Sequence, residues 1–285
     1  MSADADEVAI TGLHAYPVKS CAGVALGEVL LIETGFEFDR AWMLVDADGE
    51  FVSQRELPRM ALVRPELRHS ELLLRAPGML PLHLALDTVE APTRVRVWDD
   101  VVAAYDMGAL AAQWFSDFLR QELRLVRFDP EHRRLSSLAW TAPLAAENAF
   151  SDGFPLLVVS EASLAGLNER LAAQGQPAVT MARFRPNLVL AGLDAHGEDF
   201  LDELAFATPD GPVRLKLVKP CPRCPIPNID PDTAEVGTEP GDTLAAYRAD
   251  ARVGGAVSFG MNAIVVEGLE RSLRVGQTGR ATLKF

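Results

Sequence analysis

The segment that most restricts what this chain can fold into is residues 219–233, which hold two of its three cysteines among five prolines. Each proline lacks a backbone N–H and restricts the residue before it, so no helix can run through the segment. Cys221 and Cys224 therefore do not open a helix, where the helix dipole would lower the pKa of a thioredoxin-type pair. We expect a rigid, extended loop that presents one thiolate to a group outside the chain.

A structural zinc site is poorly supported, because it needs four ligands, usually from a second C-x-x-C or a histidine pair. The only other cysteine is Cys21, and the five histidines are scattered. Cys224 is the strongest candidate for a metal ligand, since Arg223 beside it would stabilise the thiolate, the form that binds metals. Its alternative is a buried, inert cysteine. Cys221 could be a second ligand, a resolving thiol or a packing residue.

Composition excludes several classes of function. The 285 residues carry 27 basic and 40 acidic side chains, and the formal charge of −13 disfavours nucleic acid as a partner without excluding a basic pocket. No apolar run approaches the ~18 residues of a membrane helix, so we expect no membrane partner. The acidic N-terminus lacks the features of a signal peptide, and the odd number of cysteines fits a reducing cytoplasm.

Short apolar and alternating stretches predict a β-rich N-terminal part. A hairpin is expected over residues 40–55, turning at Asp48-Gly49, because this pair adopts positive φ readily. Residues 213–218 alternate and predict a strand with Arg214 and Lys216 on its outer face. Further N-terminal strands are expected at 8–16, 24–32, 62–67, 71–75 and 93–98.

Two helices have clear signals. The first is expected over residues 108–121, with Leu110, Trp114 and Phe118 on one face, and the second begins after the capping residue Ser160. The composition changes near the first helix. The sequence therefore predicts an α+β protein with at least one barrel-like sheet.

Basic and amide side chains at strand ends and loops form a second group of candidates. If they converge, they would form a pocket for an anionic phosphate and a polar heterocycle, with bidentate contacts from arginine. The alternative for each is a solvated surface charge. Residues 230–232 (DPD) favour a capped turn over a role in holding the cysteine loop. The candidates are Lys19, Ser20, Arg40, Arg55, Arg183, Arg185 and Asn187.

Several motifs, in order along nearly the whole chain, resemble those of MOSC-domain proteins (molybdenum cofactor sulfurase C-terminal domain). The similar subgroup is the mitochondrial amidoxime-reducing component and its bacterial relatives, which have a β-barrel N-terminal domain. The resemblance implies an N-terminal β-barrel-like domain at residues 6–125, and a β-barrel-like MOSC core with a few helices at 126–285, which carries the Cys224 loop. The motifs are YPVKSC (16–21), DRxW (39–42), SQR (53–55), SDGFP (151–155), SEASL (160–164), FRPN (184–187), CPRC (221–224), IDPDT (229–233), TLxxYR (243–248) and FGxN (259–262).

The resemblance implies a molybdenum cofactor whose metal is held by the molybdopterin dithiolene and by one protein cysteine, here Cys224. Pro222 stands where the human-type proteins have a small polar residue, and Asn262 replaces an aromatic. The implied cofactor-binding residues are Lys19, Ser20, Arg40, Asp152, Gly153, Phe154, Arg183, Arg185, Asn187, Arg223 and Asn262.

The implied activity is a molybdenum-dependent reduction of N-hydroxylated substrates such as amidoximes and hydroxylamines. No cysteine follows Cys224, so we expect no iron–sulfur cluster in this chain, and electrons from a separate protein of the ferredoxin or flavoprotein type. Pyridoxal phosphate is not expected. Two alternatives stay open: a molybdenum cofactor carrier or sulfur-transfer module without turnover of its own, and a thiol-redox protein that uses Cys221 and Cys224.

Overall fold

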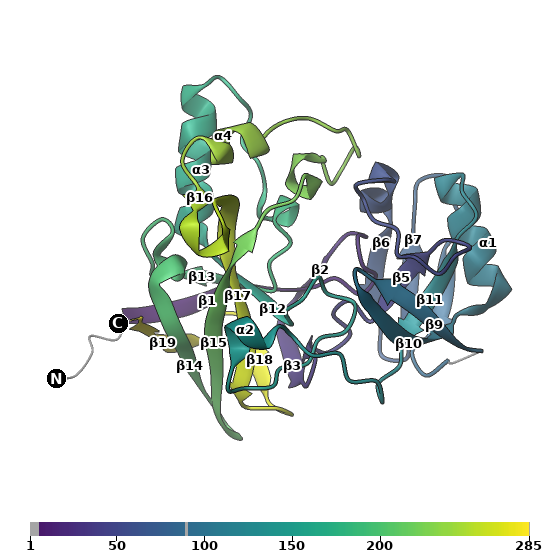
Figure 1. Cartoon of the computed structure of the whole chain (residues 1–285), viewed down its shortest axis with the longest axis horizontal. Helices are drawn as coiled ribbons and strands as arrows, with labels where there is room; N and C mark the ends of the chain where they lie inside the picture. The colour runs from purple at the N-terminus through teal and green to yellow at the C-terminus, as the bar shows by residue number, and fades with distance from the viewer. Residues whose placement is uncertain (1–5, 89–90, 285) are drawn as a thin grey trace.

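The computed structural model describes residues 6–88 and 91–284 and divides them between two lobes (Figure 1). Residues 1–5, which contribute to the expected cytoplasmic location, lie outside the described residues. Within the described ranges, none of the helices has the length and apolar character needed to span a bilayer.

The larger lobe is a closed barrel of seven strands. Its order is β12-β13-β1-β19-β14-β15-β17, and β17 pairs again with β12 to close the ring. Short strands β2 (Val24–Leu26) and β16 (Ala249–Asp250) pair with β1 and β17. The barrel strands are β1 (Asp6–Ala15), β12 (Leu156–Ser160), β13 (Leu188–Ala191), β14 (Leu201–Thr208), β15 (Gly211–Pro222), β17 (Ala256–Glu267) and β19 (Thr278–Leu283).

Alternation along β15 confirms the pattern predicted from the sequence. Val213, Leu215 and Leu217 are fully buried in the barrel core, whereas Arg214 and Lys216 lie outside and form ion pairs with β14. Full burial of each such apolar side chain contributes about 1.5–3 kcal/mol. The periodicity of two thus fixes which face of the strand forms the core.

The smaller lobe has two sheets and a helix. A four-stranded sheet has the order β5-β11-β10-β9, and a three-stranded sheet has the order β6-β7-β8. Helix α1 (Gly108–Leu119) packs through Ala111, Trp114, Phe115 and Phe118, but Leu110 is 72% exposed, so the predicted face is rotated toward Ala111 and Phe115. The strands are β5 (Trp42–Val45), β6 (Arg64–Leu67), β7 (Glu71–Arg75), β8 (Leu82–Ala85), β9 (Pro92–Val97), β10 (Asp100–Asp106) and β11 (Arg124–Phe128).

The first strands of the chain belong in space to the barrel lobe. β1 lies between β13 and β19, and β3 (Glu28–Ile32) pairs with both β4 (Gly35–Phe36) and β18 (Ser272–Arg274). A division at residues 125/126 therefore does not coincide with the sheets, and the domain boundary stays a prediction. The α+β class, with a barrel and few helices, is confirmed.

Most of the remaining helices cover the barrel lobe, whereas the 3₁₀ turn η1 (Pro58–Leu62) packs through Met60 in the core of the smaller lobe. Ser160 caps α3 (Glu161–Ala173) as predicted, by accepting a hydrogen bond from the backbone N–H of Ser163. The others are α2 (Leu138–Thr141), α4 (Gly241–Ala245) and the 3₁₀ turns η1 (Pro58–Leu62), η2 (Met181–Arg183), η3 (Gly197–Phe200), η4 (Ile226–Asn228) and η5 (Ala251–Val253).

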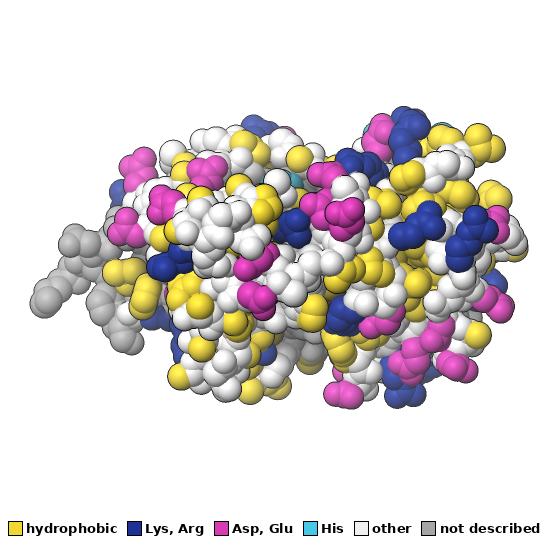
Figure 2. Space-filling view, turned by 90° about the horizontal axis from the view of Figure 1, so that it is seen from above, with side chains coloured by type: hydrophobic (Ala, Val, Ile, Leu, Met, Phe, Trp, Pro, Cys, Tyr) yellow, Lys and Arg dark blue, Asp and Glu magenta, His cyan; other side chains and the backbone are white. Residues whose placement is uncertain are grey.

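The outer surface seen in Figure 2 carries acidic and basic side chains interspersed, without one large patch of either sign on that face. Concentrated charge lies instead in the space between the lobes.

Candidate functional site

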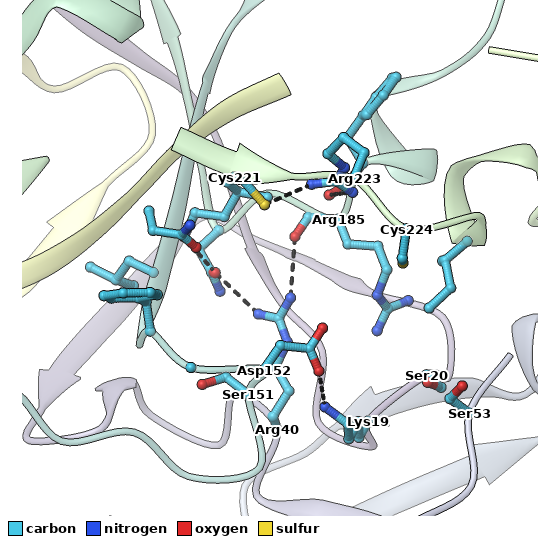
Figure 3. A pocket seen from close by; sticks show the side chains of 18 of the residues that line it. Lys19, Ser20, Arg40, Ser53, Ser151, Asp152, Arg185, Cys221, Arg223 and Cys224 are labelled. Atoms are coloured by element: carbon cyan, nitrogen blue, oxygen red, sulfur yellow. Dashed lines mark hydrogen bonds and ion pairs between the residues drawn. The ribbon is translucent and has the colours of Figure 1, made fainter. Parts of the chain in front are cut away.

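A cleft between the two lobes gathers nearly all of the predicted site residues (Figure 3). It encloses about 760 Å³, counted with the solvent at its mouth. We call it the cleft. Its lining is Lys19, Ser20, Arg40, Ser53, Arg55, Ser151, Asp152, Gly153, Phe154, Leu156, Leu157, Phe184, Arg185, Asn187, Cys221, Arg223, Cys224, Ile226 and Asn262.

The cysteine loop begins as an extension of strand β15. Residues 219–222 pair only with β17, because the pairing of β15 with β14 ends at Lys216. Pro220 and Pro222 therefore stand on an edge, where a missing N–H breaks no ladder. Opposite them Gly260 has φ +79, and an added Cβ would lie 2.6 Å from Val159, so only glycine fits where β17 bends. The segment is a strand up to Pro222, extended as predicted, but a 3₁₀ turn (η4, Ile226–Asn228) follows, so the prediction holds only for its first part.

Arg183 holds this loop rather than lining the cleft. Its guanidinium donates to the Pro227 carbonyl at 3.1 Å and to Asp230 at 2.8 Å, and it faces a second cavity that shares Arg185 with the cleft. Asp230 also accepts from the backbone N–H groups of Asp232 and Thr233, which makes the predicted capped turn. Asp230 therefore caps the turn and also helps to hold the cysteine loop through Arg183, so both roles considered for residues 230–232 are present.

The two loop cysteines have different surroundings. The Arg223 guanidinium donates to Cys221 Sγ at 3.1 Å and to the Phe184 carbonyl at 3.0 Å. The sulfur that Arg223 contacts is thus that of Cys221, and its stabilising effect on the Cys224 thiolate stays a prediction. Cys224 Sγ has no hydrogen-bond partner in the described part of the chain, and it lies apart from the dashed contacts of Figure 3.

Two guanidinium groups stack on one buried tyrosine at the base of the cleft. Arg40 and Arg185 lie 4.4 and 4.2 Å from the ring centroid of Tyr16. Burial, and next the nearby charge of Arg40, lower the pKa of Arg185 to about 10, while burial raises the pKa of Tyr16 to about 12. Arg185 therefore stays charged and the phenol stays neutral at physiological pH.

Asp39 and Asn187 set the position of Arg40. The Arg40 guanidinium donates to Asp39 at 2.5 Å, to Asn187 Oδ1 at 3.1 Å and to the Arg185 carbonyl at 3.2 Å. Asn187 is 1% exposed, and its amide also bonds the backbone of Leu157 and His14. Its Oδ1 accepts twice and its amide nitrogen donates once within the protein, so it orients Arg40 and links β1 to β12.

Backbone strain accompanies these contacts. Ser20, Arg40 and Arg185 all have positive φ, at 66°, 49° and 57°. Such conformations cost of order 1–3 kcal/mol at non-glycine residues and are kept only where the surroundings impose them. Nothing in the sequence marks these three positions.

Lys19 and Asp152 form an ion pair at the mouth. Lys19 Nζ is 2.5 Å from Asp152 Oδ1 and 2.8 Å from the Phe150 carbonyl. The lysine side chain is 7% exposed and the aspartate side chain 64% exposed. Burial lowers the pKa of Lys19 against the opposing effect of Asp152. For Asp152 burial raises the pKa, but Lys19, Arg55 and Arg40 outweigh this and hold it well below its usual range.

The remaining predicted residues are brought together as well. Ser20, Gly153, Phe154 and Asn262 line the cleft, and the Asn262 amide donates to the Lys219 carbonyl at 3.3 Å. The pocket thus collects every predicted site residue except Arg183.

Beside Cys224 the cleft opens into a wider hollow of about 1290 Å³, counted with open solvent, which we call the vestibule. Sequence reasoning missed its main features. The sequence predicts only that Trp98 ends a strand, and no sequence motif indicates a role for Arg134. The lining is Arg55, Trp98, Asp99, Asp100, Arg134, Leu135, Ser137, Asp152, Gly153, Phe154, Lys219, Pro222 and Cys224.

The electrostatics of the cleft favour an anionic ligand. Its lining carries five cationic side chains and the single carboxylate of Asp152, in a chain whose formal charge is −13. Two buried donors, Arg185 Nη2 and Arg223 Nε, have no hydrogen-bond partner within residues 6–88 and 91–284. A buried donor left unpaired costs about 1–3 kcal/mol, so this cleft is built for acceptors that a ligand brings. No group of three or more His, Cys, Asp or Glu side chains in these ranges could hold a metal ion.

Comparison with known families covers both lobes. The MOSC N-terminal beta barrel domain matches residues 7–122, and the MOSC domain matches residues 145–279.

Curated relatives extend over most of the chain. The mitochondrial amidoxime reducing component 2 of Rattus norvegicus is 37% identical over 248 residues, which are 82% of this chain and 70% of that protein. The mitochondrial amidoxime-reducing component 1 of Homo sapiens is 36% identical over 249 residues, covering 84% of this chain and 72% of that protein.

Proposed function

The chain belongs to the MOSC family, with the mitochondrial amidoxime-reducing components as relatives, and from that premise we propose that it is a molybdenum-cofactor enzyme that reduces N-hydroxylated compounds. The proposal includes a separate electron donor and a cytoplasmic location. It extends to amidoximes, hydroxylamines and related bases as substrates.

The observation that carries the proposal is the pair of unpaired buried donors, Arg185 Nη2 and Arg223 Nε, in a cleft with a surplus of positive charge. Molybdopterin has a phosphate and a pterin ring whose oxygen and nitrogen atoms accept hydrogen bonds, so the residues present fit this group. Lys19, Arg40 and Arg185 would hold the anionic end and Arg223 the ring system. Cys224 would supply the thiolate for the metal.

When bound, this cofactor supplies two-electron chemistry with oxygen-atom transfer. Overall, the substrate N–O bond breaks, and two electrons from a donor protein and two protons convert the hydroxyl oxygen to water. The chain's part is to hold the charged end in a dry, basic cleft and to leave Cys224 at an edge that substrate can reach. Lys19 has two functions in this scheme, because it also fixes the carboxylate of Asp152 beside that edge.

The donor is proposed to be a separate redox protein of the ferredoxin or flavoprotein type. Because the chain carries a formal charge of −13, an acidic donor needs a local basic surface to approach. Arg55 and Lys219, which line the vestibule near Cys224, are candidates for that contact.

The first test is the metal and pterin content of protein co-expressed with cofactor biosynthesis, compared for wild type, Cys224→Ser and Cys221→Ser. We expect near-stoichiometric molybdenum and pterin in wild type, loss of metal in Cys224→Ser, and retention in Cys221→Ser. Loaded wild type should then reduce benzamidoxime with an artificial electron donor.

Three results would contradict this scheme. Wild type without metal and pterin would remove the cofactor from the proposal. Full loading without reduction, together with a persulfide on Cys224 and ready release of cofactor, would favour a carrier or sulfur-transfer module. Equal loss of function in both cysteine variants would favour a dithiol.

A further inference from the structure

The cleft is lined by side chains from both lobes, so a ligand that fills it contacts both. Lys19 belongs to the smaller lobe, because its backbone N–H donates to the Trp42 carbonyl at 2.7 Å and the nearby Cys21 packs in the core of that lobe. Cys224 follows β15 and belongs to the barrel lobe. A ligand in the cleft is therefore released most easily when the lobes separate.

The acidic turn of the cysteine loop carries one carboxylate to each lobe. Asp230 accepts a hydrogen bond from Arg183 of the barrel lobe at 2.8 Å. Asp232 accepts one from Arg64, the first residue of β6 in the smaller lobe, at 2.7 Å. Within the described part of the chain, the Arg64–Asp232 pair is the one hydrogen bond or ion pair that joins the cysteine loop to the smaller lobe. We call this pair the clasp.

The clasp lies at the end of the cleft away from the vestibule. Both of its residues line the second cavity, which shares no lining residue with the vestibule. At the vestibule end, Asp152 accepts hydrogen bonds from Lys19 and from the indole N–H of Trp98. Loss of the clasp would therefore free one end of the cleft while the other end stays joined.

The exposure of the clasp limits the size of its effect. The side chains of Arg64 and Asp232 are 62% and 73% exposed. An ion pair this exposed contributes little to the stability of a fold, and salt screens it further. It can still change the rate at which two packed parts separate by a few-fold, because it must break before they move apart.

We propose that Arg64 and Asp232 are positioning residues that hold the cysteine loop against the smaller lobe and thereby slow the release of the cofactor. Neither residue lines the cleft, so neither contacts a ligand there. The effect on release rests on the proposed function, whereas the contact between the lobes rests on the ion pair itself.

The first test measures how fast pterin appears in the ultrafiltrate of the loaded full chain. Arg64→Gln and Asp232→Asn should each release it about two- to fivefold faster than wild type, because each removes the same exposed ion pair. The charge-swapped double variant, Arg64→Asp with Asp232→Arg, should return the rate to within about twofold of wild type. High salt should bring the rate of wild type close to that of Arg64→Gln.

Arg274→Gln is the matched control. The Arg274 side chain is 64% exposed, and its ion pair with Glu28 lies within the barrel lobe, so its release rate should equal that of wild type. The melting temperature of every variant should fall by less than about 3 °C. Faster release in Arg64→Gln alone could then not come from a general loss of stability.

Hydrogen exchange tests the clasp in the cofactor-free chain. The backbone N–H of Asp230 donates to the Glu235 carbonyl at 2.8 Å, and that of Ala234 donates to the Asp230 carbonyl at 2.9 Å. In Arg64→Gln these two amides should exchange about two- to fivefold faster than in wild type, because the loop loses its contact with the smaller lobe. In Arg274→Gln they should exchange at the wild-type rate.

The inference is overturned if Arg64→Gln keeps the wild-type rates of release and exchange, if Arg274→Gln releases pterin equally fast, or if the charge swap restores neither rate. Benzamidoxime reduction by loaded wild type, with unchanged release and exchange in Arg64→Gln, would remove the clasp and leave the proposed function standing. Faster exchange in Arg64→Gln, in a protein that takes up no cofactor, would remove the proposed function and the role in release and leave the contact between the lobes standing.

Discussion

The cleft and the vestibule meet at Cys224, yet their linings differ in kind. Five cationic side chains and one carboxylate line the cleft, and its arginines are stacked, strained and partly unpaired. The vestibule balances three cations with three carboxylates around exposed aromatic surface.

The two linings suit two kinds of ligand, one that stays bound and one that exchanges. A surplus of buried charge suits a ligand that stays bound, because its anion completes contacts that the protein cannot make alone. A charge-balanced, open surface suits ligands that arrive and leave, since neither state leaves a buried charge unpaired. Four experiments test this contrast between the cleft and the vestibule.

The largest effect is expected for thiol accessibility. Cys21 is fully buried, and burial raises the pKa of its thiol to about 12, from an ordinary value of 9.0. In protein freed of cofactor, iodoacetamide at pH 8 should modify Cys221 and Cys224 and should modify Cys21 at least about a thousandfold more slowly, because three pH units remove that much thiolate. Peptide mass spectrometry gives the rates.

Cofactor loading provides the control for this alkylation. Loading should protect Cys224 more than Cys221, because a thiolate bound to metal is not free to attack, whereas Cys221 only lines the occupied cleft. Equal protection of both cysteines would contradict the assignment of Cys224 as the metal ligand.

The second-largest effect is expected for the free energy of unfolding when a residue of the vestibule wall is changed. Arg134 is 6% exposed and donates to Asn148, to the Ala149 and Ser151 carbonyls and to Asp100. Arg134→Met should lower the free energy of unfolding by about 3 kcal/mol, because it leaves buried acceptors unpaired. Urea unfolding measures the loss.

Arg133 is the matched control for Arg134, since its side chain is 70% exposed and pairs only with Glu147 among the described residues. Arg133→Met should cost less than about 1 kcal/mol. Equal costs for the two neighbours would contradict the view that Arg134 holds the wall together.

A third experiment compares how much Arg185 and Arg183 contribute to cofactor retention. Arg185→Met should weaken cofactor retention about a hundredfold, equal to about 2.7 kcal/mol, because it removes a charged donor from the cleft. Arg183→Met should change retention by less than about threefold, since its side chain holds the loop from outside the cleft. Pterin content after gel filtration is the readout. A greater loss for Arg183 would return it to the cofactor site.

The smallest effect is expected for Asp152 and pH. The folded-state pKa of Asp152 lies below its unfolded value, so its carboxylate contributes stability above about pH 4 that is lost as pH falls through the folded pKa. The side chain is 64% exposed, and solvent screening limits this contribution to less than about 1 kcal/mol. Asp152→Asn should therefore be slightly less stable than wild type at pH 7, and the gap should narrow as pH falls below about 4. A gap that does not change with pH would point to lost packing instead of charge.

Much of the secondary structure could be predicted from the sequence because it depends on local residue patterns. Alternation in β15 and the Ser160 cap depend only on neighbours in sequence, and both are confirmed. The convergence of Lys19, Arg40, Arg185 and Cys224 followed from motif order, although their roles stay proposals.

Other features depend on geometry that spacing does not encode. Arg185 has a positive φ and its side chain reaches the cleft, whereas that of Arg183 reaches only the second cavity. Arg223 donates to Cys221, two residues before it, and Trp98 itself has a positive φ in its turn. Tertiary register, rather than residue type, decides each of these.

The pairing of β1 with β19 has a consequence for biosynthesis. β1 is synthesised long before one of its neighbours in the barrel, since Glu7 lies opposite Arg280 of β19. At about 5–20 residues per second, β1 waits tens of seconds on the ribosome before its ring can close. The intervening sheets of the smaller lobe and α1 can assemble meanwhile, since their partners lie within residues 42–128. The nascent chain should therefore emerge with a folded smaller lobe and an open, aggregation-prone barrel, which is the stage at which it most needs a chaperone.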